Sequence, residues 1–205
     1  MSSGPINAAA LAFSYPHVPH KRKHGPSGYK SYQQYRDWLR DEFWFRCPVC
    51  LFRKRWAVGP EAIFHIDHIK PHASSPTLHL DYDNLIYVCA RCNLLKGCCD
   101  LVDPSVAATH NSLRISADGS VEALNDEGRI LVSVYRLNAP TAIEYRAKML
   151  RVLQTLQPSD LSAWVGFPSN MPDLRTKHPP HNSRPNGVND CCFVLREQGR
   201  LPEVY

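Results

Sequence analysis

Hydrophobic side chains recur at helical spacing in one early part of the chain. Four of them lie three or four positions apart there: Tyr32, Tyr35, Leu39 and Phe43. This spacing places side chains on one face of an α-helix, so we predict a helix within residues 29–45.

Two short segments beyond this helix have the composition of β-strands. AIFHIDHI, residues 62–69, is rich in β-branched and aromatic side chains and is closed by a proline, and LIYVC, residues 85–89, is a short apolar run. The polar sequence between them is typical of a loop. NLLKG, residues 93–97, follows the second segment and predicts the start of a helix that Gly97 or the residues after it end.

The following part of the chain predicts a hairpin and two helices. LRIS and VEAL flank the dipeptide Asp118-Gly119, which supplies the positive φ that a tight hairpin turn needs. The apolar positions of residues 130–137 fit a helix, with a strand left open as the alternative. Pro140 suits the first turn of a further helix that runs to about Leu156.

These patterns divide the chain into four regions. Residues 1–28 lack periodicity and are rich in proline, serine, glycine, histidine and basic residues, which predicts a flexible basic arm. Residues 29–105 carry the strand and helix signals of a core, and residues 106–157 form an α+β extension. Residues 158–205 are rich in proline and asparagine and are expected to wrap the surface, with the apolar segment CCFVL docking back.

Composition indicates a globular intracellular protein. The chain is 43% hydrophobic and 21% charged, and no apolar run approaches the length of a membrane span. The early segment AAALAF is too short for a signal peptide and lacks a basic flank. A cytosolic location is therefore expected, where thiols stay reduced and eight cysteines point to metal binding rather than disulfides.

The net charge of +5 is concentrated in the first 60 residues, which hold ten Lys or Arg against three Asp or Glu. A basic patch attracts polyanions, so we expect it to bind nucleic acid, with a soluble tail that binds nothing as the alternative. The candidate contacts are the two basic runs, Lys21, Arg22 and Lys23 together with Arg53, Lys54 and Arg55.

Two cysteine pairs have the spacing of a zinc site. Each pair encloses two residues, so each can chelate one edge of a metal ion, and together they offer four thiolates for tetrahedral zinc. The four predicted ligands of a structural zinc are Cys47, Cys50, Cys89 and Cys92. The alternative is four buried free cysteines. The other four lack this spacing and are expected to pack in the interior: Cys98, Cys99, Cys191 and Cys192.

The sequence between and after these two cysteine pairs, here called the knuckles, resembles the HNH endonucleases. The matching segments are HIDHI, DYDNL and CARCNLLKG, which contain Asp67-His68, Asn84 and Asn93. GRILVSVYRLNAP, IEYR, RPNGV and LPEVY look like the distal part of a bacterial HNH subfamily. Asn93 stands where the family name implies a final histidine, and asparagine is a common variant there.

The resemblance implies a ββα-metal core braced by the zinc site, with hydrolysis of DNA phosphodiester bonds as its activity. His68 would be the general base, since a histidine pKa lies near neutrality. Asp67 and Asn93 would bind a catalytic Mg²⁺ or Mn²⁺, which prefers oxygen ligands. By analogy, Asn84 would hold the loop between the strands and orient His68, and Lys96 would contact a phosphate.

Several alternatives stay open on the sequence. The chain could be a non-catalytic zinc module that binds nucleic acid, or a nuclease subunit that needs a partner such as the ATPase of an anti-phage defence system, and RNA is an alternative substrate to DNA. His65 shares a strand face with Asp67 and is expected to be a partly buried histidine rather than the base. Three tryptophans are expected to pack in the core or against the knuckle: Trp38, Trp44 and Trp56.

Overall fold

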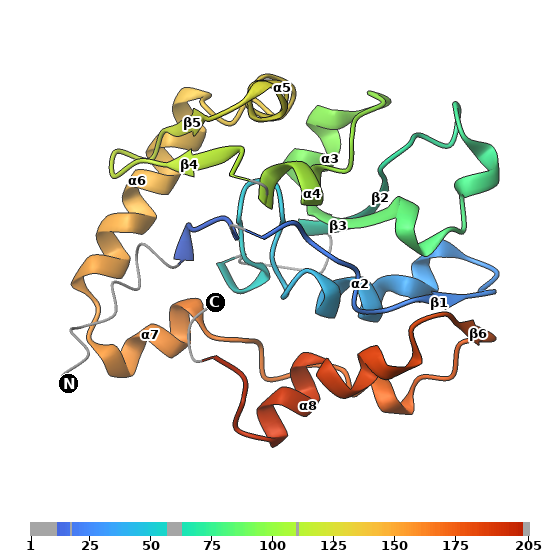
Figure 1. Cartoon of the computed structure of the whole chain (residues 1–205). Helices are drawn as coiled ribbons and strands as arrows, with labels where there is room; N and C mark the ends of the chain where they lie inside the picture. The colour runs from blue at the N-terminus through green and yellow to red at the C-terminus, as the bar shows by residue number, and fades with distance from the viewer. Residues whose placement is uncertain (1–11, 17, 57–62, 110, 203–205) are drawn as a thin grey trace.

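The computed structural model describes residues 12–16, 18–56, 63–109 and 111–202 (Figure 1). Within these residues, short helices surround three separate antiparallel sheets of two strands each. The predicted α+β fold class is confirmed.

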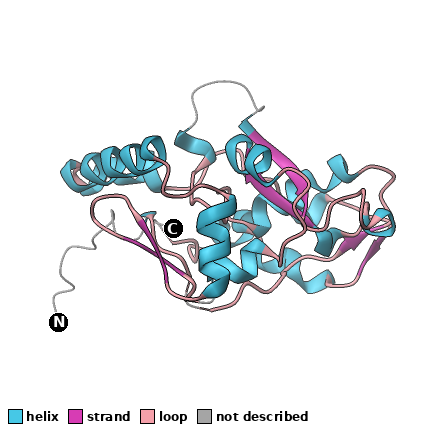
Figure 2. Cartoon of the chain, turned by 90° about the horizontal axis from the view of Figure 1, so that it is seen from above, coloured by secondary structure: helices cyan, strands magenta, loops and turns pink. Residues whose placement is uncertain are grey.

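The regular elements follow one another along the chain as short units (Figure 2). The strands are β1 (Pro26–Ser27), β2 (Phe64–His68), β3 (Leu85–Cys89), β4 (Leu113–Ile115), β5 (Val121–Ala123) and β6 (His181–Asn182). The α-helices are α2 (Arg36–Glu42), α3 (Ala90–Lys96), α4 (Pro104–Thr109), α5 (Asp126–Val134), α6 (Pro140–Thr155), α7 (Pro158–Val165) and α8 (Cys192–Glu197).

A ββα unit lies at the centre of the molecule. β2 pairs antiparallel with β3 so that His68 faces Leu85 and Phe64 faces Cys89, and α3 follows β3 without a connecting loop. Every residue of β3 is buried, because the helices on its two sides cover both faces. The helix starts at Ala90, three residues before the segment that predicted it, and Gly97 ends it with a φ of 52°.

The helix predicted within residues 29–45 is confirmed as the 3₁₀ helix η1 (Tyr32–Tyr35) followed by α2. Ser31 and Gln34 form a capping box that satisfies backbone N–H groups at its start. Helical geometry stops at Phe43 because Trp44 and Phe45 adopt positive φ angles of 55° and 58°.

The extension after the core follows the sequence prediction. β4 and β5 form the hairpin, and Gly119 in its turn has a φ of 87°. A Cβ atom on Gly119 would lie 2.5 Å from the Ile143 carbonyl oxygen, so the turn packs directly on α6. Ile130, Leu131 and Val134 belong to α5, which confirms the helix over the strand, whereas Leu137 lies beyond the end of this helix.

The C-terminal region crosses back beneath α2 in the lower part of Figure 1. β6 pairs with β1, so segments near residues 26 and 182, far apart in the sequence, meet in one small sheet. The segment that contains CCFVL becomes α8, and it docks on the core as expected because Cys191, Cys192 and Val194 are buried.

The described part of residues 1–28 differs from the predicted flexible basic arm. Residues 20–24 run as a strap along the end of α2, where the side chains of Asp41 and Glu42 are fully buried. Glu42 accepts hydrogen bonds from the backbone N–H groups of Lys23 and His24, at 2.8 and 3.0 Å. The strap is ordered because two buried carboxylates need these donors, and sequence periodicity carries no sign of such a bond.

A second set of contacts extends this anchor. Asp41 accepts a hydrogen bond from the His24 ring at 2.8 Å, forms an ion pair with Lys23 at 3.0 Å, and accepts from the backbone N–H of Cys192 at 2.7 Å. The carboxylate of Asp41 therefore joins the N-terminal strap to α8. Hydrogen bonding by His24 and the charge of Lys23 lower the pKa of Asp41 to about 2, although burial acts in the opposite direction.

The tryptophans pack as expected where the structure shows their surroundings. Trp38 is buried in the main core, and Trp56 contacts Phe13 and donates a hydrogen bond to the Trp164 carbonyl oxygen. Trp44 lies between Phe167 and the Lys23 ammonium. None of the helices in the described residues is long and apolar enough to span a membrane.

Candidate active site and metal centre

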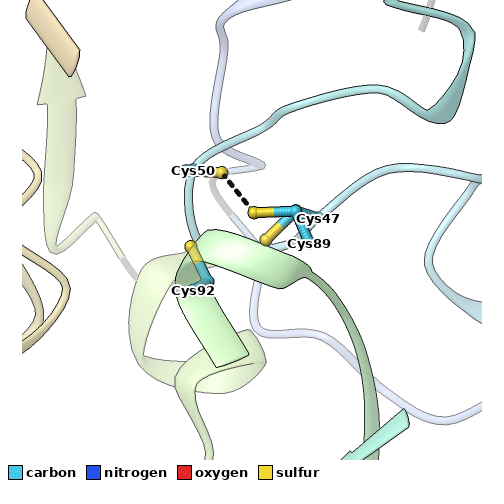
Figure 3. Close-up of side chains that lie close together, drawn as sticks. All are labelled: Cys47, Cys50, Cys89 and Cys92. Atoms are coloured by element: carbon cyan, nitrogen blue, oxygen red, sulfur yellow. Dashed lines mark hydrogen bonds between the residues drawn. The ribbon is translucent and has the colours of Figure 1, made fainter. Parts of the chain in front are cut away.

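The four cysteines of the two knuckles converge on one point. Cys47 and Cys50 come from the turn after α2, Cys89 ends β3, and Cys92 lies in the first turn of α3 (Figure 3). Their sulfur atoms all lie within 4.8 Å of one another, and the Cys50 and Cys89 sulfurs are 3.6 Å apart. Tetrahedral zinc with Zn–S bonds of about 2.3 Å requires sulfurs separated by about 3.8 Å, so the donor set fits zinc.

The electrostatics of the cluster also fit a bound cation. Hydrogen bonds from Cys47 and the other thiols lower the pKa of Cys89, while the same contacts raise the pKa of Cys50 and Cys92. One thiolate at this site therefore suppresses the ionisation of its neighbours. A divalent cation removes that conflict, because it stabilises all four thiolates together.

The remaining cysteines divide into two pairs. Cys191 and Cys192 are buried, as predicted, but Cys98 and Cys99 are exposed, so the prediction that they pack in the interior is wrong. The positive φ of Gly97 turns the chain away from the core at the end of α3, and the two residues that follow enter solvent.

Asp67 and His68 end β2 and direct their side chains to different sides of it. Successive side chains of a strand alternate between faces, and here Asp67 lies towards Lys96 of α3 while the His68 ring contacts Tyr32 of η1. His65 shares the face of Asp67, two positions away, and pairs across the ribbon with Val88. Asp67 and His68 can therefore contact different groups, although they are adjacent in the sequence.

The His68 ring has a defined hydrogen bond. Its Nε2 lies 3.0 Å from the backbone carbonyl oxygen of His79. A carbonyl oxygen accepts only, so Nε2 carries the proton and Nδ1 keeps a free lone pair in the neutral ring. Partial burial lowers the pKa of His68, which keeps the ring neutral at pH 7.

Asn84 fastens the loop that carries His79. Its Oδ1 accepts from the Lys70 N–H at 2.9 Å, and its Nδ2 donates to the carbonyl oxygens of Lys70 and Leu78 at 3.2 Å each. The buried amide thus connects the end of β2 to the residue that precedes His79. The geometry agrees with the predicted role of Asn84, since His68 Nε2 donates its hydrogen bond to the carbonyl oxygen of His79, the residue after Leu78.

Asp67 has one engaged and one unengaged oxygen. Oδ1 accepts from the His68 N–H at 2.8 Å, whereas Oδ2 is buried and has no hydrogen-bond partner among the described residues. The nearest cation is the Lys96 ammonium, 3.6 Å from Oδ2. Burial raises the pKa of Asp67, and the Lys96 charge opposes that rise.

Lys96 itself does not lie where a phosphate contact would need it. Only 2% of the residue is exposed, and its ammonium donates to the His68 carbonyl oxygen at 2.8 Å. The predicted phosphate contact is therefore replaced by an internal tie between α3 and the end of β2. Asn93 precedes Lys96 by three residues, so both lie on the side of α3 that faces Asp67.

This arrangement fits the oxygen ligands of a small divalent cation. Asp67 Oδ2 is a buried carboxylate oxygen that lacks a hydrogen-bond donor among the described residues, and Asn93 lies on α3, the helix whose Lys96 faces Asp67. Mg²⁺ and Mn²⁺ bind through one or two such oxygens and otherwise retain water.

The residues predicted to bind nucleic acid are mostly engaged inside the protein. Arg22 donates to the Leu85 carbonyl oxygen at 2.7 Å, Lys23 pairs with Asp41, and Arg53 is fully buried and donates to the Ala12 carbonyl oxygen at 3.2 Å. Arg55 is exposed and donates to the Gly166 and Phe167 carbonyl oxygens. Lys54 is half-buried. In the KRK run, Lys21 is exposed, whereas Arg22 and Lys23 are half-buried.

The comparison with protein families agrees with this geometry. Residues 47–98, about a quarter of the chain, match the family model of the HNH endonuclease. The matched segment contains all four knuckle cysteines, Asp67, His68, Asn84 and Asn93, and the match supports a nuclease-type function. No curated protein and no solved structure was found to match the chain.

Sequence reasoning did not identify two side chains that touch His68. The rings of Tyr32 and His79 lie 5.2 and 5.1 Å from the His68 ring. Tyr32 lies on the face of the predicted helix, and His79 lies in the polar segment that predicts a loop between the two strands. No local signal places either residue beside His68, since the contacts depend on how η1 and the 69–84 loop pack together.

Proposed function

We propose that the chain is a metal-dependent endonuclease that hydrolyses phosphodiester bonds of DNA. The observation that carries this proposal is the pairing of a histidine whose Nδ1 is free with a neighbouring carboxylate oxygen that is buried and accepts no hydrogen bond from the described residues. Phosphodiester hydrolysis needs these two functions, a base for water and a ligand for a cation.

In this proposal His68 accepts the proton of the attacking water at Nδ1. The carbonyl oxygen of His79 holds Nε2–H and stabilises the charge that the ring gains when it is protonated. The lowered pKa of His68 keeps its base form populated at neutral pH. A cation held by Asp67 and Asn93 would polarise the phosphate and stabilise the leaving oxygen.

The zinc knuckle has a structural part in this proposal. Cys89 ends the strand beside β2, and Cys92 lies one residue before Asn93. Zinc bound by these cysteines fixes the start of α3 against β3, and thereby the distance from Asn93 to Asp67. All four ligand positions are filled by protein thiolates, so the zinc keeps no open position for water.

Cleavage of supercoiled plasmid tests the proposal. Purified protein with Mg²⁺ or Mn²⁺ should convert the plasmid to relaxed or linear DNA, and excess EDTA should stop the reaction. Asp67→Ala should lose both cleavage and divalent-cation binding, while Asn93→His should keep measurable activity. Cleavage that persists in EDTA would refute the role of the cation.

The same assay separates the alternatives. A non-catalytic zinc module would bind the plasmid in a gel-shift experiment and leave it uncut under all cation conditions. Single-stranded RNA in place of plasmid tests the other substrate. A subunit that works only with a partner, such as a defence-system ATPase, would cut only after that protein is added.

A further inference from the structure

Three aromatic side chains form a column beside the candidate base. The rings of His68 and His79 are stacked, with centroids 5.1 Å apart and planes 14° apart. The His72 ring packs against His79, with centroids 4.6 Å apart and planes tilted by 36°. Tyr32 closes the side of the column, since its ring meets both His68 and His79 edge-on, at 5.2 and 5.3 Å.

We infer that Tyr32 and the side chain of His79 form an aromatic clamp that positions the imidazole of His68 with Nδ1 as its unprotonated nitrogen. The inference deepens the proposed function and rests on it for the catalytic consequence. The tautomer and the orientation of the ring are properties of the protein alone, so they can be measured whether or not DNA is cut.

The clamp acts on a ring that would otherwise rotate. His68 is the last residue of β2 and is only half-buried, so the strand fixes its backbone but leaves two side-chain torsions to its surroundings. One hydrogen bond, to the His79 carbonyl oxygen, restrains Nε2 but permits rotation about the bond axis. A stacked ring on one face and an edge-on ring beside it remove that freedom.

The two clamp residues come from different elements, which makes the arrangement dependent on the fold. Tyr32 lies in η1 before α2, and His79 lies in the loop that Asn84 fastens. His79 contributes twice, because its carbonyl oxygen holds Nε2 and its ring stacks on the imidazole. Its Nδ1 is buried without a hydrogen-bond partner among the described residues, which leaves aromatic packing as the role of the His79 ring.

A set of matched variants tests the clamp. Tyr32→Ala and His79→Ala each remove a ring, whereas Tyr32→Phe and His79→Phe keep one in place. Replacement of His79 leaves its backbone carbonyl, so the Phe variant retains both the hydrogen bond and the stack. His72→Ala serves as a control, because the His72 ring touches His79 and lies outside the contacts made by Tyr32.

Nitrogen NMR of the His68 ring supplies the readout that a merely structural role would not move. In the parent and in both Phe variants, the shifts should report a single tautomer with the proton on Nε2. Tyr32→Ala and His79→Ala should give a mixture of tautomers. Thermal unfolding accompanies each spectrum, and a variant that fails to fold is replaced by Tyr32→Leu or His79→Leu, which fill space without a ring.

Cleavage kinetics give the second readout. The Ala variants should lower kcat by about tenfold or more with little change in KM for DNA, since a misoriented base weakens general-base catalysis but not binding. The Phe variants should recover most of kcat. An unchanged tautomer in both Ala variants would overturn the clamp, and a single tautomer in a parent protein that cuts no DNA would instead overturn the proposed function.

Discussion

The buried pair of Lys96 and Asp67 gives the sharpest energetic prediction. The Lys96 ammonium lies 3.6 Å from Asp67 Oδ2, and the side chains are 1% and 15% exposed. Two unit charges at this distance attract by about 5 kcal/mol at an effective dielectric constant of about 20. Desolvation of both groups offsets much of that attraction, so the net coupling should be about 2 kcal/mol.

Lys96→Met removes more than the ion pair. The His68 carbonyl oxygen also loses the donor that lies 2.8 Å away, and a hydrogen bond to a charged group contributes about 1.5–3 kcal/mol. The substitution leaves the Asp67 carboxylate buried without a counter-charge, which costs about 3–5 kcal/mol in buried pairs generally. We expect the free energy of unfolding to fall by roughly 4 kcal/mol.

Urea unfolding of the parent, Lys96→Met, Asp67→Asn and the double variant forms a double-mutant cycle that measures the coupling free energy of the pair. The matched control is the exposed pair of Lys148 and Glu144, whose charged atoms are closer, at 2.7 Å, but whose side chains are 68% and 62% exposed. Solvent screens that pair, so its cycle should give no measurable coupling. Equal coupling in the two cycles would refute the reasoning, because burial and not distance is what separates them.

The pH dependence gives an independent check on the same pair. Burial already raises the pKa of Asp67, and loss of Lys96 raises it further. Protonation of Asp67 removes the uncompensated charge, so the cost of Lys96→Met should shrink as pH is lowered from neutrality towards the raised pKa of Asp67. A cost that is constant over this range would mean that Asp67 is not the group affected.

Three further outcomes follow from the described contacts. Elemental analysis should find about one zinc per chain at the four cysteines, and Cys92→Ala should lose that zinc and unfold without cooperativity, because a closed tetrahedral site loses one ligand. Glu42→Gln should lower the free energy of unfolding by about 3 kcal/mol at neutral pH, since hydrogen bonding by His20 and nearby cations lower the pKa of Glu42 from 4.5 to about 2 despite burial. In urea unfolding, this loss of stability should become smaller as pH falls from about 4.5 towards 2. Lys21→Ala should weaken DNA binding and reduce its salt dependence without affecting stability, whereas Arg22→Ala should lower the unfolding temperature because its guanidinium bonds a buried strand.

Local chemistry made much of the core predictable from sequence. The paired cysteines define a metal site by ligand type and spacing, and an apolar run of five residues becomes β3 within its predicted bounds. Asp118-Gly119 predicts its turn because few other residues adopt the required φ. In each case the interaction that determines the structure lies within a few residues of the signal.

Features that depend on distant partners were not predictable in the same way. The position of Lys96 near the end of a helix is typical of an exposed cation, and its burial depends on a carbonyl group 28 residues earlier in the chain. Lys23 and His24 belong to a segment whose composition is typical of a mobile arm, yet carboxylates at the end of α2 bind them. The division into four regions, and the resemblance beyond residues 47–98, stay predictions because the family match ends there.

The central claim is that His68 is the base, and cleavage by His68→Ala measured beside His65→Ala tests it most directly. Both are half-buried histidines of β2, so His65→Ala is a control for the loss of an imidazole from this strand. With supercoiled plasmid and saturating Mg²⁺ or Mn²⁺, His68→Ala should bind DNA and zinc normally, but its cleavage rate should fall by about a hundredfold or more. His65→Ala should keep most of the parent rate. Parent-like cleavage by His68→Ala, or loss of cleavage in His65→Ala alone, would contradict the account.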